Sequence, residues 1–151
     1  THTAHAMIIA EELDAEWENI NVVTTNNINS EYNTDSWGVY TGGNRGIRFW
    51  WDRLRVIGAG TRELLVTAGA QKMDVPLIEC TAQNGHVVHF ASGRQLSFGE
   101  LALIASKLKP SSNPRLKSEE KFRFVGKPIR RVDSVLFNKS STSHDKSANP
   151  R

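Results

Sequence analysis

The sequence predicts a two-layer α/β (α+β) domain with one long helix, a β-hairpin and a disordered C-terminal tail. Helical periodicity continues from Asn44 to Met73, a length that crosses a small domain. The pair Asn84-Gly85 separates two short β-like runs and is the strongest short signal for a hairpin. Residues 134–151 contain four apolar side chains and no periodicity, so burial cannot offset the entropy of ordering them.

The first forty residues predict a helix, a strand and a polar loop. A helix is expected at about 2–15, because apolar residues recur on one face and Thr1 or Thr3 can cap it. The apolar run that follows predicts a strand at about 19–24. Residues 26–40 are polar and long for a structureless loop, which is typical of a functional or disordered segment.

One continuous apolar face is predicted for the long helix at about 44–73. Arg48, Asp52 and Arg55 stand at helical spacing and are expected to pair on its surface. Small residues cluster in its interior, where glycine is unfavourable, so we expect a neighbouring sheet or helix to pack very closely. The apolar face comprises Ile47, Trp50, Leu54, Ile57, Thr61, Leu64 and Ala68.

The remaining elements follow from turn and capping signals. Strands are predicted at about 78–83 and 86–91, on either side of the hairpin turn. The sequence Ser97-Phe98-Gly99-Glu100 is a capping box that opens a helix at about 97–108. Residues 110–133 are interpreted as a linker.

Composition limits the function classes. At 151 residues the chain can form one domain with its own core. Its single cysteine, Cys80, excludes an intrachain disulfide and a thiolate metal cluster, and is expected to be buried. No transmembrane segment is predicted, because no apolar run approaches the roughly 20 residues needed.

Charge is unevenly distributed. The first 40 residues hold seven of the 16 acidic residues and none of the 19 Lys and Arg residues. A basic C-terminal part could indicate nucleic acid, but its basic residues are dispersed without a recognised binding pattern. Acidic and basic parts that complement each other within one fold, or within a larger assembly, explain the split equally well.

The strongest candidate site is the glycine-rich turn before the long helix. Backbone N–H groups at a helix start attract anions, glycine allows close approach, and an arginine can bind phosphate. The simpler interpretation, a loop with an N-cap, stays open. The turn is Thr41-Gly42-Gly43-Asn44-Arg45.

No metal site or catalytic residue is predicted from the residues. His2 and His5 share a helix face without a third ligand, whereas His86 and His89 would point to opposite faces of a strand. No order of Ser, His and Asp indicates a triad, and no pair of carboxylates has an acid–base context.

Six segments, taken in order, carry a resemblance to a known family. They are Met7–Trp17 with Ile20–Val23, Thr41–Arg45, the small-residue helix, the Asn84-Gly85 hairpin, Gly93–Leu101, and Phe124–Pro128 with Arg131 and Asp133. Over roughly residues 1–133, the chain resembles the large, molybdenum-cofactor-binding subunit of the xanthine dehydrogenase/aldehyde oxidase superfamily. The branch is that of the isoquinoline 1-oxidoreductase β-subunit and its membrane-associated aldehyde dehydrogenase relatives.

The resemblance implies a domain organisation and a set of cofactor contacts. Residues 1–109 would form part of a molybdopterin-binding domain, 110–133 would lead toward a missing next domain, and 134–151 would be a non-native tail. A Gly-Gln-Gly loop that touches the cofactor would precede Thr1. The cofactor-binding residues implied are Thr3, Thr41, Gly42, Gly43, Asn44 and Arg45.

The resemblance also implies a reaction. Enzymes of this family hydroxylate aldehydes or N-heterocycles with a water-derived oxygen at molybdenum, and electrons leave through an iron–sulfur small subunit. Their catalytic glutamate would lie beyond Arg151. We therefore expect a truncated or frameshifted fragment that contributes one wall of the molybdopterin site, is inactive alone and holds no cofactor by itself.

Two other classes stay open at this point. One is a small basic module that binds nucleic acid or another polyanion, given the isoelectric point near 9.2. The other is a structural or regulatory protein without a ligand.

Overall fold

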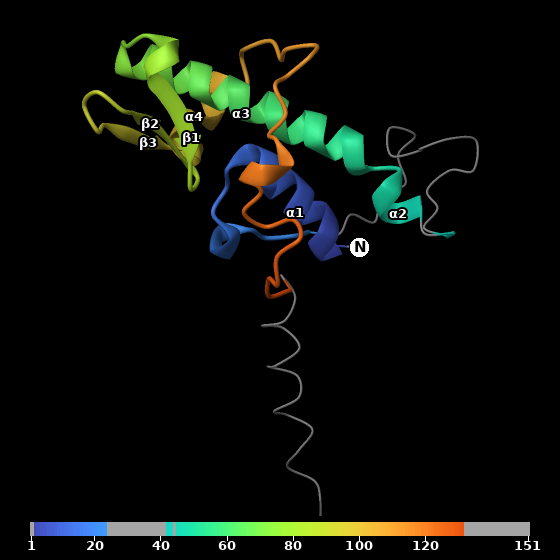
Figure 1. Ribbon diagram of the computed structural model, residues 1–151. Helices are drawn as coiled ribbons and strands as arrows, with labels where there is room; N and C mark the ends of the chain where they lie inside the picture. The colour runs from blue at the N-terminus through green and yellow to red at the C-terminus, as the bar shows by residue number, and fades with distance from the viewer. Residues whose placement is uncertain (1, 24–41, 44, 132–151) are drawn as a thin grey trace, which may run out of the picture.

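The computed structural model describes residues 2–23, 42, 43 and 45–131 of the chain (Figure 1). The polar segment at 26–40 and the tail at 134–151 lie outside the described residues. Three short 3-10 turns, four helices and three strands are described. In order they are α1 (His2–Leu13), η1 (Trp17–Asn19), α2 (Arg45–Arg48), α3 (Trp51–Met73), η3 (Leu77–Glu79), β1 (Cys80–Gln83), β2 (His86–His89), β3 (Gln95–Ser97), α4 (Phe98–Ala105) and η4 (Glu119–Lys121).

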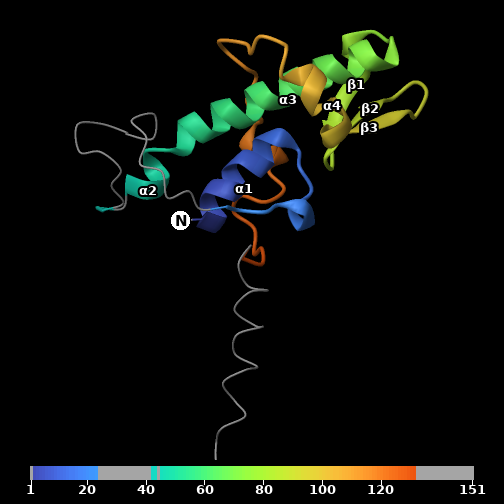
Figure 2. The ribbon, with the colours of Figure 1, turned by 180° about the vertical axis from the view of Figure 1, so that it is seen from behind.

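The predicted α+β class is confirmed. Helix α3 extends along the molecule, with the sheet and α4 at one end and α2 at the other (Figures 1 and 2). Helix α1 packs against the middle of α3. Residues 110–131, predicted as a linker, return across α1, where they make the hydrogen bonds described below.

The long helix forms largely as expected, but its beginning is interrupted. A turn at Phe49 and Trp50 separates α2 from α3. Beyond Met73, Asp74 adopts the left-handed conformation (φ 54°), and its N–H bonds to the carbonyl groups of Ala70 and Gln71. This αL residue ends the helix by satisfying carbonyls of the last turn.

The apolar face predicted for this helix is wrong at Ile47 and Ile57, which are exposed, and right at Leu54 and Ala68, which are buried. The prediction of close packing is confirmed. Ile57 is 53% exposed, while the adjacent Gly58 is buried. A Cβ on Gly58 would lie 2.9 Å from the Ile9 carbonyl of α1, and one on Gly69 would lie 2.6 Å from the Val87 side chain of β2. The buried side therefore follows the small residues, because both neighbours approach the helix backbone itself.

The strand predicted at 19–24 is also wrong. The 3-10 turn η1 occupies its beginning, and residues 20–23 have no regular structure. Ile20 instead packs beside Ala10, Ala15 and Phe124. Among the described residues, no strand pairs with this apolar run. The run buries Ile20 against α1 and Phe124 instead of joining a sheet.

The hairpin prediction is confirmed and extended. Antiparallel β1 and β2 meet through Asn84 (φ 47°) and Gly85 (φ 75°), both in the positive region that this two-residue turn requires. A third strand, β3, pairs with β2 and was not predicted, since three residues are too few for periodicity. The capping box before α4 is present: Ser97 accepts from the Glu100 N–H, and its own N–H donates to that carboxylate.

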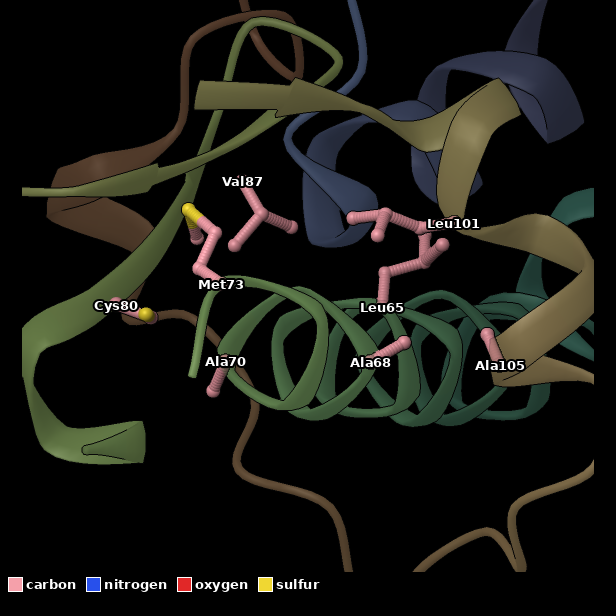
Figure 3. Close-up of a cluster of buried hydrophobic side chains, with 8 residues drawn as sticks. All are labelled: Leu65, Ala68, Ala70, Met73, Cys80, Val87, Leu101 and Ala105. Atoms are coloured by element: carbon pink, nitrogen blue, oxygen red, sulfur yellow. The ribbon is translucent and has the colours of Figure 1, made fainter. Parts of the chain in front are cut away.

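The main core lies between α3, the sheet and α4. Figure 3 shows Val87, Leu101, Leu65 and Met73 pointing toward one another from these elements. Val87 and Leu101 have no exposed surface. The sheet and α4 are thus fixed to one end of α3, which leaves the α1–α2 end for the candidate site.

Candidate functional site

The glycine turn predicted to bind anions is accessible. Gly43 is exposed with φ +59°, and a Cβ placed on it would meet nothing within 4 Å. The Arg45 N–H donates to the Gly42 carbonyl at 3.1 Å. Thr41 and Asn44 lie outside the described residues. A group can therefore approach the backbone at Gly43 without meeting a side chain of the described residues.

The helix that starts at this turn is shorter than predicted. Helix α2 has four residues, and the 23-residue α3 begins only at Trp51. Because dipole effects act at the first turn of a helix, those of α3 are centred beyond Phe49 rather than at Gly43. Anion binding at the turn would depend on glycine backbone groups and on Arg45, not on a long helix.

The turn lies beside the first turn of α1. His5 Nε2 forms a short hydrogen bond with the Gly46 carbonyl, and both ribbon views show the start of α1 next to α2 (Figures 1 and 2). Thr3, in the same turn of α1, is half-buried. Two segments that are about forty residues apart in the sequence thus meet at one end of the molecule.

An apolar groove of about 430 Å³ begins at this contact and was not predicted. One wall is α1, and the other is the irregular segment that the sequence suggested as a strand. Only the apolar character of that segment gave a signal. The groove is lined by His5, Ala6, Ile9, Ala10, Leu13, Ile20, Asn21, Val22 and Val23.

Glu11 fixes the C-terminal segment onto α1. Its side chain is 1% exposed, and its Oε2 accepts the backbone N–H groups of Arg123, Phe124 and Val125 at 2.9, 2.6 and 3.0 Å. Lys117 Nζ lies 3.5 Å from Oε1. A buried carboxylate that accepts several backbone donors is satisfied without a full counter-ion. The residues 123–125 are held as a turn over α1.

Glu12, the next residue, binds α3 in the same manner. Its carboxylate has no exposed surface and accepts from Arg55 Nε at 2.7 Å, from Arg62 Nη1 at 3.4 Å and from the Lys117 N–H at 2.9 Å. The prediction that Arg55 pairs along the surface of its own helix is therefore wrong. Spacing within one helix cannot reveal a partner on another helix.

These contacts account for part of the uneven charge distribution. The acidic residues of α1 and the residue after it, Asp14, bind basic residues that follow much later in the chain. Lys117 Nζ lies 2.5 Å from Asp14. The complementarity that composition left as one of two explanations is thus found within this fold. Four of the basic residues are used here: Arg55, Arg62, Lys117 and Arg123.

The histidines of the hairpin point to opposite faces, as predicted. His86 Nδ1 contacts the Asn84 carbonyl, while His89 is buried with Nε2 2.7 Å from Glu79 Oε2 and Nδ1 2.7 Å from Ser92 Oγ. Within the part of the chain that the structure describes, no three His, Cys, Asp or Glu residues are grouped to hold a metal ion.

Cys80 is buried, as predicted. Burial raises the pKa of its thiol, the nearby Glu79 carboxylate raises it further, and Arg94 lowers it. No helix among residues 2–23 and 45–131 is both long and apolar enough to cross a membrane.

Comparison with known proteins identifies similar chains. The sequence is 37% identical over 115 residues to the isoquinoline 1-oxidoreductase subunit β of Brevundimonas diminuta. The aligned stretch covers 75% of this chain and 14% of that protein. The sequence is also 28% identical over 150 residues to the membrane-bound aldehyde dehydrogenase [pyrroloquinoline-quinone] of Gluconacetobacter polyoxogenes, covering 89% of this chain and 18% of that one. No family model matches.

The chain thus spans less than a fifth of the length of either relative. The names of both relatives are those of the branch that the six sequence segments resemble. Over this stretch, the similarity to these two relatives supports the molybdopterin oxidoreductase family.

Proposed function

We propose that this chain is a segment of a molybdenum hydroxylase large subunit and forms one wall of its molybdopterin site. The observation that carries the proposal is the contact between the glycine turn and the first turn of α1. In the family, the turn and the loop before α1 would both contact one cofactor. Such a site needs these segments side by side.

The residues present suit a phosphate-bearing cofactor. Among the described residues, nothing fills the space beside the Gly43 backbone. Arg45, in the glycine turn, carries a guanidinium, and Thr3, in the first turn of α1, carries a hydroxyl donor. The proposed contacts are Thr3, Thr41, Gly42, Gly43, Asn44 and Arg45. When bound, the cofactor would supply hydroxylation of an aldehyde or N-heterocycle, with an iron–sulfur subunit as the electron partner.

A chimera tests these contacts. The matched stretch of the Brevundimonas subunit is replaced by that of this chain, and molybdenum content is measured per folded protein. Arg45→Ala should weaken cofactor retention about 10- to 100-fold, the equivalent of one charge-assisted hydrogen bond. Arg48→Ala, an exposed arginine of the same short helix, is the matched control. Equal molybdenum content in both variants would contradict the assignment of Arg45.

The 151-residue chain alone should contain no molybdenum and oxidise no aldehyde with a dye acceptor. One wall supplies too few donors to offset the loss of hydration of a charged cofactor. Elemental analysis of the purified chain checks this. Stoichiometric metal, or turnover above the blank, would contradict the proposal that the chain holds only one wall.

The alternative of a basic polyanion-binding module has less support than composition alone suggested. Four of the basic residues bind acidic groups of the same fold rather than facing solvent as a patch. A gel shift with random DNA distinguishes the two, because a module of this kind would bind with a steep dependence on salt.

A further inference from the structure

The outer edge of β1 carries backbone groups that point away from the sheet. The strand order is β1-β2-β3, so β1 is an end strand. The Phe90 N–H donates to the Glu79 carbonyl at 3.0 Å, and hydrogen-bonded pairs alternate with non-bonded pairs in an antiparallel ladder. Thr81 therefore bonds to β2, whereas the backbone groups of Cys80 and Ala82 point outward.

Part of this edge has no partner within the described part of the chain. The Cys80 N–H is used by the Leu77 carbonyl in η3. No hydrogen bond among the described residues reaches the Ala82 N–H, the Ala82 carbonyl or the Cys80 carbonyl. Unpaired groups along a strand edge are the template on which a further strand pairs.

A groove of about 740 Å³ lies along this edge. It touches Cys80, Thr81 and Ala82 in succession, although their side chains alternate between the two faces of the sheet. A cavity in contact with three consecutive residues runs beside the strand rather than over one face. Its other walls are α3 and the segment around Leu116, and Leu77 also lines it.

The groove has the chemistry to hold an extended acidic segment. Leu77 and Leu116 are 53% and 36% exposed and offer apolar contacts. Besides the acidic side chains Asp14 and Glu63, the lining contains four basic ones. Two of these, Arg62 and Lys117, already bind Glu12 and Asp14. Arg115 and Lys121 are therefore the ones that can meet an acidic segment.

We propose that an extended, acidic segment of the remaining large-subunit polypeptide binds in this groove as an added strand on β1. The identity of this occupant rests on the proposed function, under which most of the subunit lies outside the stretch that matches this chain. Main-chain bonds to Ala82 and Cys80 give the affinity, and the basic and apolar lining selects the side chains. The edge is thereby covered in the assembled subunit.

Hydrogen exchange of the Ala82 amide tests this inference. In the isolated chain at low concentration, Ala82 should exchange faster than Thr81, whose N–H bonds to β2. In the chimera described above, exchange at Ala82 should slow by about tenfold or more, because a new strand bonds to it. If the chimera does not fold, the isolated chain is mixed with the Brevundimonas subunit that lacks the matched stretch, and the same amide is followed.

A variant pair separates edge pairing from general stability. Ala82→Pro removes the outward N–H, which edge strands tolerate, but also adds ring atoms at a buried position, so its cost is compared between the two proteins. It should destabilise the chimera more than the isolated chain. Gln83→Ala, at an exposed position of the same strand, should affect both equally. Equal effects of Ala82→Pro in the two proteins would overturn the proposal.

The remaining outcomes distinguish the two proposals. If Ala82 stays fast in a chimera that retains molybdenum, this inference fails and the proposed function stands. If Ala82 is protected in a chimera without molybdenum, the proposed function fails and the added strand stands. Slow exchange of the Ala82 amide in the isolated chain at low concentration overturns the inference, because the chain then covers its own edge. Protection of this amide that rises with concentration also overturns it, because a second copy of the chain then covers the edge.

Discussion

Glu11 offers the sharpest test of how this fold is held together. Glu11→Gln keeps the shape of the side chain but removes its charge. One carboxylate oxygen accepts three backbone N–H groups, from Arg123, Phe124 and Val125, and the other lies near Lys117. In the variant, the amide oxygen can retain the three bonds only as neutral ones, and the NH₂ group then faces Lys117.

The expected cost follows from these bonds. A hydrogen bond to a charged group contributes about 1 kcal/mol more than a neutral one, so three weakened bonds amount to about 3 kcal/mol of unfolding free energy. For a chain of this size, that corresponds to a fall in Tm of roughly 6–12 °C. The rival expectation is a neutral effect, because a glutamine avoids the cost of burying a charge.

Urea unfolding and hydrogen exchange decide between the two. Glu18→Gln makes the same change of charge at an exposed site and should shift stability by about 0.5 kcal/mol or less. The amides of Phe124 and Val125 should exchange faster in Glu11→Gln than in the parent chain. If Glu11→Gln costs no more than Glu18→Gln, or leaves these two amides unchanged, the carboxylate does not hold the segment and the reasoning fails.

Three further predictions concern packing, pH and thiol reactivity. Gly58→Ala should destabilise the chain by about 1–2 kcal/mol in urea unfolding, because the new Cβ would lie 2.9 Å from atoms of α1. Gly60→Ala makes only ordinary contacts and should stabilise the chain by up to about 1 kcal/mol. A gain in stability from both substitutions would contradict the close approach of α1. The side-chain hydrogen bond from Ser97 lowers the pKa of Glu100, so its contribution to stability is present above its ordinary pKa and is lost as pH falls through the lower folded value. The stability of Glu100→Gln should therefore fall less than that of the parent chain between about pH 5 and 3, and parallel curves would refute this. Cys80 should react with a thiol reagent at neutral pH more slowly in the folded chain than in urea, because burial raises its pKa and restricts access; equal rates would contradict its burial.

Local signals in the sequence were read correctly because their physics is local. The turn at Asn84-Gly85 needs two residues with positive φ, and the capping box needs a serine and a glutamate three residues apart. The cluster of small residues in α3 correctly indicated a close neighbour. It did not say that α1 packs at Gly58 and the sheet at Gly69.

Predictions that depended on a distant partner were the ones that failed. The run at 19–24 has the residues of a strand, but it packs as an irregular segment against α1. Arg55 has a possible partner on its own helix, yet it binds the buried Glu12. In each case two options are locally comparable, and burial against another element decides between them.

The features of the candidate site also fall into those that local sequence indicates and those that depend on packing. The glycine turn, the resemblance to the molybdopterin oxidoreductases and the residues proposed to contact the cofactor all follow from residue types and their order in the chain. Only the tertiary structure brought that turn beside the start of α1, reduced its helix to four residues and left the edge of β1 along a groove. The reason is that contacts between segments far apart in the chain depend on how α1 and the sheet pack on α3, which no local pattern encodes.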